Sequence, residues 1–93
     1  LFPYTTLFRS RQEAAADLAS AVDAMVVIGG RNSSNTTRLA EVCALTCPRT
    51  FHIESTDELD PEAFADCRRV GVTAGASTPE NQIAAVEAFL RAL

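Results

Sequence analysis

The chain has no long apolar run, no excess of positive charge and few aromatic side chains. No segment approaches the roughly 20 apolar residues that would span a membrane. Nothing near the start has the charged-then-apolar order of a signal peptide. The formal net charge is −4 over 93 residues, which argues against non-specific nucleic-acid binding. These absences favour a small cytoplasmic domain whose partner is neither a membrane nor a nucleic acid.

Cysteine is scarce and follows no metal-binding pattern. The three cysteines, Cys43, Cys47 and Cys67, match no zinc signature. Cys43 and Cys47 stand four apart and would share one helix face, so two thiolates could hold part of a metal site. A zinc or iron–sulfur site needs three or four ligands, however, and no other Cys or His stands near them. We therefore expect free, partly buried thiols in a reducing compartment.

Strands and helices are predicted to alternate along the chain. Short apolar runs predict strands at Met25–Ile28, Thr50–Ile53 and Arg69–Thr73. Helical composition or spacing marks residues 11–22, Arg38–Leu45, Pro61–Ala65 and the segment from Pro79 to Leu93. This order implies a small parallel sheet joined by right-handed crossovers, with helices on both faces. The expected fold class is therefore α/β in three layers.

Small polar residues follow the first predicted strand, in the segment Gly29–Thr36. Glycine lets the backbone turn tightly, and the first N–H groups of the next helix have no acceptor inside it. Those donors and the positive end of the helix dipole suit a bound phosphate. Asn and Ser are also common N-caps, so the segment could merely start a helix. Four consecutive small polar residues exceed what one cap requires, which favours the phosphate interpretation.

A second loop of small residues, Ala74–Thr78, follows the third predicted strand. Loops after parallel strands emerge at the carboxyl edge of the sheet, where open α/β sheets bind ligands. We therefore expect both loops to lie on one rim. Between them, the acidic connector Glu54–Asp60 is predicted to be solvated. His52 is interpreted as a packed or surface histidine on its strand.

Five segments carry a family resemblance, and they occur in the family's order. They are Arg11–Ala14, Val27–Gly30, Asn32–Asn35, Arg38–Leu39 and Val70–Pro79. Together they resemble the C-terminal third of the 4-hydroxy-3-methylbut-2-enyl diphosphate reductase family. The resemblance extends from Arg11 to about Leu93, which is most of the chain.

The resemblance implies a specific function. Family members carry three pseudo-equivalent α/β domains around a central [4Fe-4S] cluster, with one cysteine from each domain. The cluster binds the allylic hydroxyl of the substrate, which two electrons and protons remove as water to give isopentenyl and dimethylallyl diphosphate. A ferredoxin or flavodoxin is the expected electron donor. By position, Ser33, Ser34 and Asn35 match residues that bind the substrate's diphosphate, and Ser77 matches another.

The chain also departs from the family. The third cluster cysteine of the family stands shortly before the Arg-Gln pair, and Thr5 occupies that position here. Residues 1–10 look like translated sequencing adapter or another foreign junction, with no helical period and no partner strand. We expect them to be a non-native or disordered leader, and residues 11–93 to be the C-terminal α/β domain.

No catalytic residue and no metal ligand is assigned to this chain, because the other cluster cysteines and the proton donor of the family belong to domains it lacks. The chain is expected to supply part of the diphosphate site and to be inactive alone. Two alternatives remain open. One is a non-enzymatic α/β module that binds a phosphate or nucleotide, although a dinucleotide fingerprint is missing. The other is a structural subdomain whose polar loops only cap helices.

Overall fold

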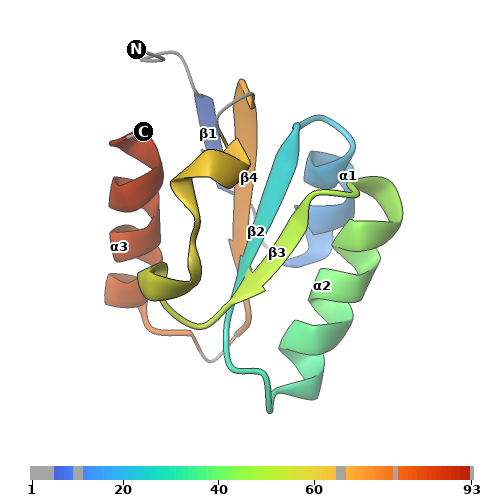
Figure 1. Ribbon diagram of the computed structural model, residues 1–93. Coiled ribbons are helices and arrows are strands. Elements are labelled where there is room, and N and C mark those ends of the chain that lie inside the picture. The colour runs from blue at the N-terminus through green and yellow to red at the C-terminus, as the bar shows by residue number, and fades with distance from the viewer. Residues whose placement is uncertain (1–5, 10–11, 65–66, 77, 93) are drawn as a thin grey trace.

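A four-stranded parallel sheet forms the centre of the structure, with helices on both of its faces (Figure 1). The computed structural model describes residues 6–9, 12–64, 67–76 and 78–92. The strands are β1 (Thr6–Arg9), β2 (Ala24–Ile28), β3 (Thr50–Ile53) and β4 (Arg69–Ala74). They are arranged in the order β1-β4-β2-β3, and each neighbouring pair is parallel. The predicted three-layer α/β class is confirmed.

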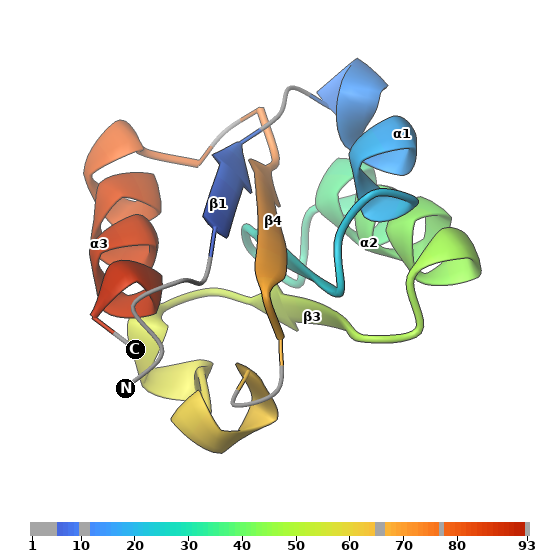
Figure 2. The ribbon, with the colours of Figure 1, turned by 90° about the horizontal axis from the view of Figure 1, so that it is seen from above.

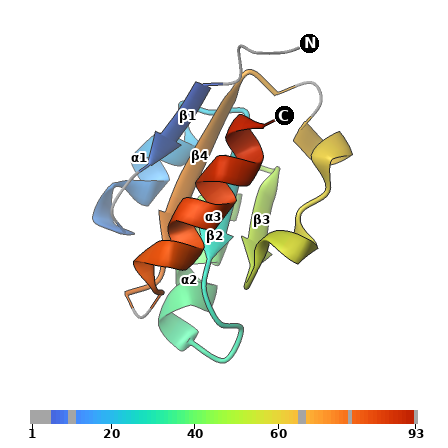
Figure 3. The ribbon, with the colours of Figure 1, turned by 90° about the vertical axis from the view of Figure 1, so that its left-hand side faces the viewer.

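The segments that connect successive strands, and the one that follows β4, contain the helices, and these helices cover both faces of the sheet. The α-helices are α1 (Ala15–Ala19), α2 (Ser34–Thr46) and α3 (Glu80–Arg91), and the 3₁₀ turns are η1 (Gln12–Ala14), η2 (Thr56–Glu58) and η3 (Pro61–Phe64). Figure 2 shows α1 and α2 on one side of the sheet and α3 on the other. In Figure 3, α3 lies across the strands on the face turned toward the viewer.

The two faces of β2 enter two separate apolar cores. Val26 and Ile28 pack with the buried α3 residues Ile83, Val86 and Leu90. Met25 and Val27 pack on the opposite face with residues of α1 and α2. All five residues of β2 are buried, because helices cover both sides. This explains the continuous apolar run, and each such side chain contributes roughly 1.5–3 kcal/mol on burial.

The first ten residues differ from the expectation. Thr6–Arg9 forms the edge strand β1, paired with β4 from Thr6 opposite Arg69 to Arg9 opposite Val72. The prediction that this segment has no partner strand was therefore wrong for Thr6–Arg9, while Leu1–Thr5 and Ser10 lie outside the described residues. The physical reason is that the edge of β4 offers backbone N–H and C=O groups, which an extended segment of almost any sequence can pair with.

The limits of several helices also differ from those predicted from the sequence. The helix expected over residues 11–22 is a 3₁₀ turn followed by the five-residue α1. Helix α2 begins at Ser34 rather than near Arg38, because Ser33 caps it. Its C-cap, Cys47, has an extended backbone before Pro48, as expected for a residue that precedes proline. The short helix predicted at Pro61 is a 3₁₀ turn.

Candidate phosphate-binding rim

The loops after β2 and β4 leave the sheet side by side. Strands β2 and β4 pair along their length, with Ile28 opposite Ala74 at the carboxyl end. The helices that follow them, α2 and α3, then pack on opposite faces, and both loops lie at the lower end of Figure 1. A crevice between adjacent strands whose connections diverge to opposite faces is the usual ligand site of an open α/β sheet. The expectation that both loops share one rim is confirmed.

Thr36 holds the two loops together. Its side chain is fully buried, and it fills the space beside both Gly29 and Gly75. A β-carbon on Gly29 would lie 2.7 Å from the Thr36 hydroxyl, and one on Gly75 would collide with the same hydroxyl. Glycine is therefore required at both positions for the loops to approach this closely. Thr36 belongs to the polar segment Gly29–Thr36 singled out in the sequence, but this packing role was not predicted.

Backbone and hydroxyl hydrogen bonds add to this connection. The amide of Gly75 and the hydroxyl of Thr78 both donate to the carbonyl of Ile28, each over 3.0 Å. The β4–α3 loop is thus bound to the last residue of β2. Ser77, the predicted diphosphate residue in this loop, lies outside the described residues. The structure therefore places its neighbours on the rim but does not describe Ser77 itself.

Ser33 is the N-cap of α2. Its Oγ accepts a hydrogen bond from the amide of Thr36 over 3.3 Å, and the Thr36 hydroxyl donates to it over 3.2 Å. The capping role, which the sequence left open as an alternative, is therefore present. Capping does not use all of the hydrogen-bonding capacity of Ser33, because a serine hydroxyl that accepts two hydrogen bonds still has one proton to donate.

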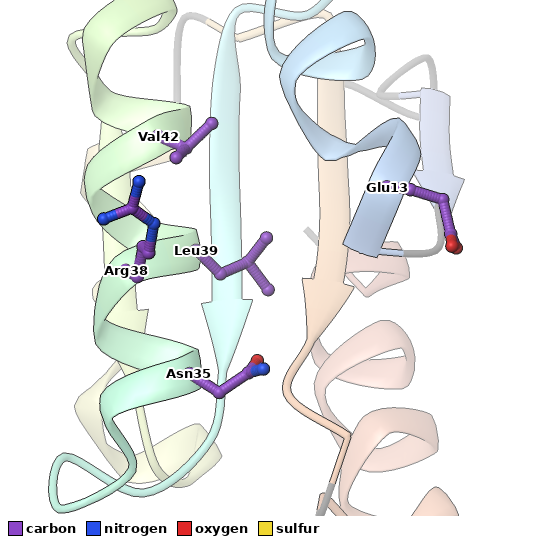
Figure 4. Close-up of a pocket in the computed structure, with 5 residues that line it drawn as sticks. All are labelled: Glu13, Asn35, Arg38, Leu39 and Val42. Carbon is purple, nitrogen blue, oxygen red and sulfur yellow. The ribbon is translucent and has the colours of Figure 1, made fainter.

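Ser34 and Asn35 occupy the first turn of α2, and both are exposed. Their amides belong to the group that has no acceptor within a helix. Asn35 also lines an open pocket of about 340 Å³ between η1 and α2, with Glu13, Arg38, Leu39 and Val42. Figure 4 shows Leu39 and Val42 at the apolar part of this pocket and Asn35 at the end nearest the loop. The rim thus combines neutral donors with the cation Arg38 one turn along the helix.

The tip of the β2–α2 loop is bound to the acidic connector. The amide of Arg31 donates to Oε2 of Glu54 over 2.9 Å, and its Nη1 donates to Oε1 of Glu54 over 3.3 Å. Its Nη2 donates to Oε1 of Glu58. The connector was predicted to be solvated, and Glu54 and Glu58 are indeed exposed, but the sequence did not predict their contacts with Arg31. The hydrogen bond from Arg31 lowers the pKa of Glu58, and the same contact raises the pKa of Arg31.

His52 contributes a further contact to this loop. It is half-buried on β3, and its Nε2 lies 3.2 Å from the carbonyl oxygen of Gly29. The interpretation of His52 as a packed histidine is consistent with this position.

Cys43, Cys47 and Cys67 form no disulfide bond, and all three are buried more deeply than the partly buried thiols that the sequence predicted. Cys43 and Cys47 belong to the core beneath α1 and α2, whereas Cys67 belongs to the core on the opposite face of the sheet. Burial raises the pKa of the Cys43 thiol, with a smaller effect from Cys47. Within the described ranges, no three His, Cys, Asp or Glu side chains gather into a possible metal site. The three thiols therefore do not form the ligand set of an iron–sulfur cluster.

No helix in the described part of the chain is long and apolar enough to cross a membrane.

A curated relative from Desulfovibrio desulfuricans, named 4-hydroxy-3-methylbut-2-enyl diphosphate reductase, is 56% identical over 85 residues. These residues are 91% of this chain and 30% of the relative. This chain therefore spans about a third of the length of such relatives.

Solved structures agree with this similarity. A structure of (E)-4-hydroxy-3-methyl-but-2-enyl diphosphate reductase, described as the terminal enzyme of the non-mevalonate pathway, matches with a TM-score of 0.85 and 46% identity. The match covers 89% of this chain and 30% of that one. A reductase structure from Plasmodium falciparum, at 23% identity and a TM-score of 0.76, covers 88% of this chain and 25% of its own and shares the fold. The family described as LytB protein matches residues 6–91, and the chain belongs to this family.

Proposed function

We propose that this chain is the C-terminal α/β domain of a reductase that removes the hydroxyl of 4-hydroxy-3-methylbut-2-enyl diphosphate, giving isopentenyl and dimethylallyl diphosphate. Residues 11–93 form that domain together with the edge strand Thr6–Arg9, and the proposed foreign leader is limited to the residues that precede the family match at 6–91. The domain supplies part of the diphosphate site through Ser33, Ser34, Asn35 and Ser77. The observation that carries the proposal is the convergence of the two family loops at Thr36, on one rim of the sheet.

The chemistry of the rim suits a diphosphate. The first turn of α2 presents two amides and the hydroxyls of Ser33 and Ser34 at the positive end of a 13-residue helix. These donors are neutral, so they bind an anion by hydrogen bonds and direct it without adding net charge. A donor set of this kind orients the substrate and does not by itself transfer electrons.

Reduction in this family is expected to use a [4Fe-4S] cluster, which supplies the electrons when it is bound. The residues of this chain do not fit that group, because its thiols lie in two cores on opposite faces of the sheet. We therefore assign no cluster ligand here and expect the isolated chain to be inactive. Two of the three cluster ligands are assigned to the remaining domains of the reductase, and Thr5 occupies the position of the third in this chain. A ferredoxin or flavodoxin is proposed as the electron donor of the whole enzyme.

The alternative is a non-enzymatic nucleotide-binding module. Such a module needs an aromatic or apolar surface beside the rim to contact a base. Phe51 and Phe64 pack on each other with ring centroids 5.1 Å apart, and both belong to the core or its margin. Phe89 also packs against that core. The use of these rings in packing favours the diphosphate proposal over the nucleotide module.

The test is a titration of the 93-residue chain with inorganic diphosphate, followed by amide NMR shifts. We expect saturable shifts at the two loops with a dissociation constant in the millimolar range, about −4 kcal/mol, because only part of the site is present. A nucleotide module would instead bind ATP or another nucleotide much more tightly than diphosphate. Shifts spread evenly over the surface, or none at the loops, would contradict the proposal.

The identity of the reductase is tested in the source DNA. Sequencing upstream of Arg11 should recover a cysteine-containing segment joined to two further α/β domains. A start codon directly upstream of Arg11, with no such cysteine, would overturn the assignment to a complete reductase. In that case the binding module becomes the better explanation.

A further inference from the structure

Arg31 lies in the middle of the proposed diphosphate loop, yet its guanidinium contacts carboxylates of the acidic connector. An arginine beside a phosphate loop is usually expected to bind the phosphate. Here Nη1 donates to Glu54 and Nη2 donates to Glu58, so both terminal nitrogens already contact carboxylates. The set of Arg31, Glu54 and Glu58, called the Arg31 network below, carries a net charge of −1.

The network links the loop to the end of β3 by a continuous series of hydrogen bonds. Glu54, which directly follows β3, accepts from both the amide and the side chain of Arg31. Glu58 accepts from Arg31 through one oxygen and from the amide of Glu54 through the other, the latter over 2.8 Å. The side chain of Arg31 is therefore the cross-link between the loop tip and the acidic connector.

The network acts on an otherwise exposed part of the loop. Gly30, Arg31 and Asn32 are exposed, and a turn bond from the amide of Ser33 to the carbonyl of Gly30 spans 3.1 Å. Because Arg31 and Glu54 are about half exposed, each ion pair alone adds little to global stability. A local contact of this type instead restricts which conformations the loop can adopt. The direction of the Ser33, Ser34 and Asn35 donors depends on that restriction.

We propose that Arg31 is a positioning residue, which holds the β2–α2 loop in its phosphate-binding conformation through Glu54 and Glu58 without touching the phosphate itself. This inference rests on the proposed function of the loop. The network has a second effect, since Arg31 offsets part of the negative charge of Glu54 and Glu58, which would otherwise repel an anion at the loop.

The test compares Arg31→Gln and Arg31→Lys with the matched control Arg91→Gln, at the opposite end of α3 from the rim. In the ligand-free chain, Arg31→Gln should lower the ¹H–¹⁵N NOE of residues 30–33, while the midpoint of unfolding falls no further than it does in Glu58→Gln. It should raise the dissociation constant for inorganic diphosphate roughly five- to tenfold. Arg31→Lys should restore affinity only in part, because an ammonium cannot bridge two carboxylates with the same geometry. Arg91→Gln should change neither readout.

A double-mutant cycle separates positioning from direct contact. In a Glu58→Gln background, Arg31→Gln should weaken diphosphate binding clearly less than it does in the parent chain, because the contact with Glu58 is already lost and only the contact with Glu54 remains to be broken. An undiminished effect in that background, or unchanged NOE values in Arg31→Gln, would overturn the inference. If the unmodified chain shows no diphosphate shifts at the loops, the proposed function fails, and the ligand-free NOE values alone then decide whether Arg31 orders the loop.

Discussion

The hydroxyl of Thr36 occupies the space into which a β-carbon on Gly75 would project. These two residues belong to different loops, and Thr36 is fully buried between them. The contact fixes the separation of the two loops of the proposed diphosphate site. It also makes the site sensitive to single-methyl changes at residues other than the four proposed to bind the diphosphate.

Gly75→Ala should therefore destabilise the fold by about 1–3 kcal/mol through overpacking. Chemical denaturation measures this effect. The double variant Thr36→Ala/Gly75→Ala should lose less than the sum of the two single changes, because removing the hydroxyl makes room for the methyl group. Gly30→Ala is the control, since its β-carbon would meet only a Glu54 oxygen at 3.8 Å. Equal stability of Gly75→Ala and the parent chain would refute the close contact.

Ser33→Ala should separate capping from binding when it is compared with Ser34→Ala. Loss of the Ser33 cap should lower stability by about 1 kcal/mol. Ser34 is exposed at the first helical position, so its replacement should stay within about 0.5 kcal/mol of the parent. Both variants should weaken diphosphate binding in the NMR titration. If Ser34→Ala leaves diphosphate binding unchanged, Ser34 does not bind the diphosphate, and the interpretation of the loop as a helix cap alone is favoured.

Low pH should reduce the contribution of Glu58 to the free energy of unfolding. The hydrogen bond from Arg31 and the amide of Glu54 lower the pKa of Glu58 from its ordinary value of 4.5. A carboxylate with a lowered folded-state pKa stabilises the fold fully above the unfolded value, and this is lost as pH falls through the folded value. The unfolding free energies of the parent and Glu58→Gln should therefore differ most at neutral pH, and the difference should shrink as the pH falls below 4.5 and through the lowered folded-state pKa. A constant difference down to pH 3 would contradict this linkage.

Some acid sensitivity should remain in Glu58→Gln. Asp23 also has a lowered pKa, because its carboxylate accepts the amides of Arg68 and Arg69 over 2.9 and 3.0 Å. Combining Glu58→Gln with Asp23→Asn should flatten the profile further.

Removal of residues 1–10 should destabilise the domain, because the segment contains the edge strand β1. Deletion breaks the β1–β4 ladder, and at roughly 0.5–1.5 kcal/mol per backbone hydrogen bond the loss should be about 2 kcal/mol or more. The exposed edge of β4 should also promote self-association, which size-exclusion chromatography detects. Replacing Thr6–Arg9 by another β-forming tetrapeptide should restore most of the stability. A strict requirement for the original four residues would argue that the segment is native.

The sequence predicts strands β2, β3 and β4 well, because each is a compact apolar or alternating run. It predicts the start of α2 poorly, since the Ser, Asn and Thr residues of its first turn have low helix propensity and the cap decides the boundary. Strand β1 carries no pattern of its own, and its pairing depends on the edge of β4. In the Arg31 network, Glu54 stands 23 positions and Glu58 stands 27 positions after Arg31, so no local pattern reveals these contacts.

The division of the interior into two cores has an evolutionary consequence. The serine-bearing loop leads into a helix that rests on one core, and the Gly75 loop leads into a helix that rests on the other. Substitutions in one core can therefore adjust the direction of one set of donors while the other set keeps its support. Changes at Thr36 and its glycine neighbours act on both sets at once. Selection on substrate fit could thus proceed in small, nearly independent steps on either side of the sheet, within limits set by one shared threonine.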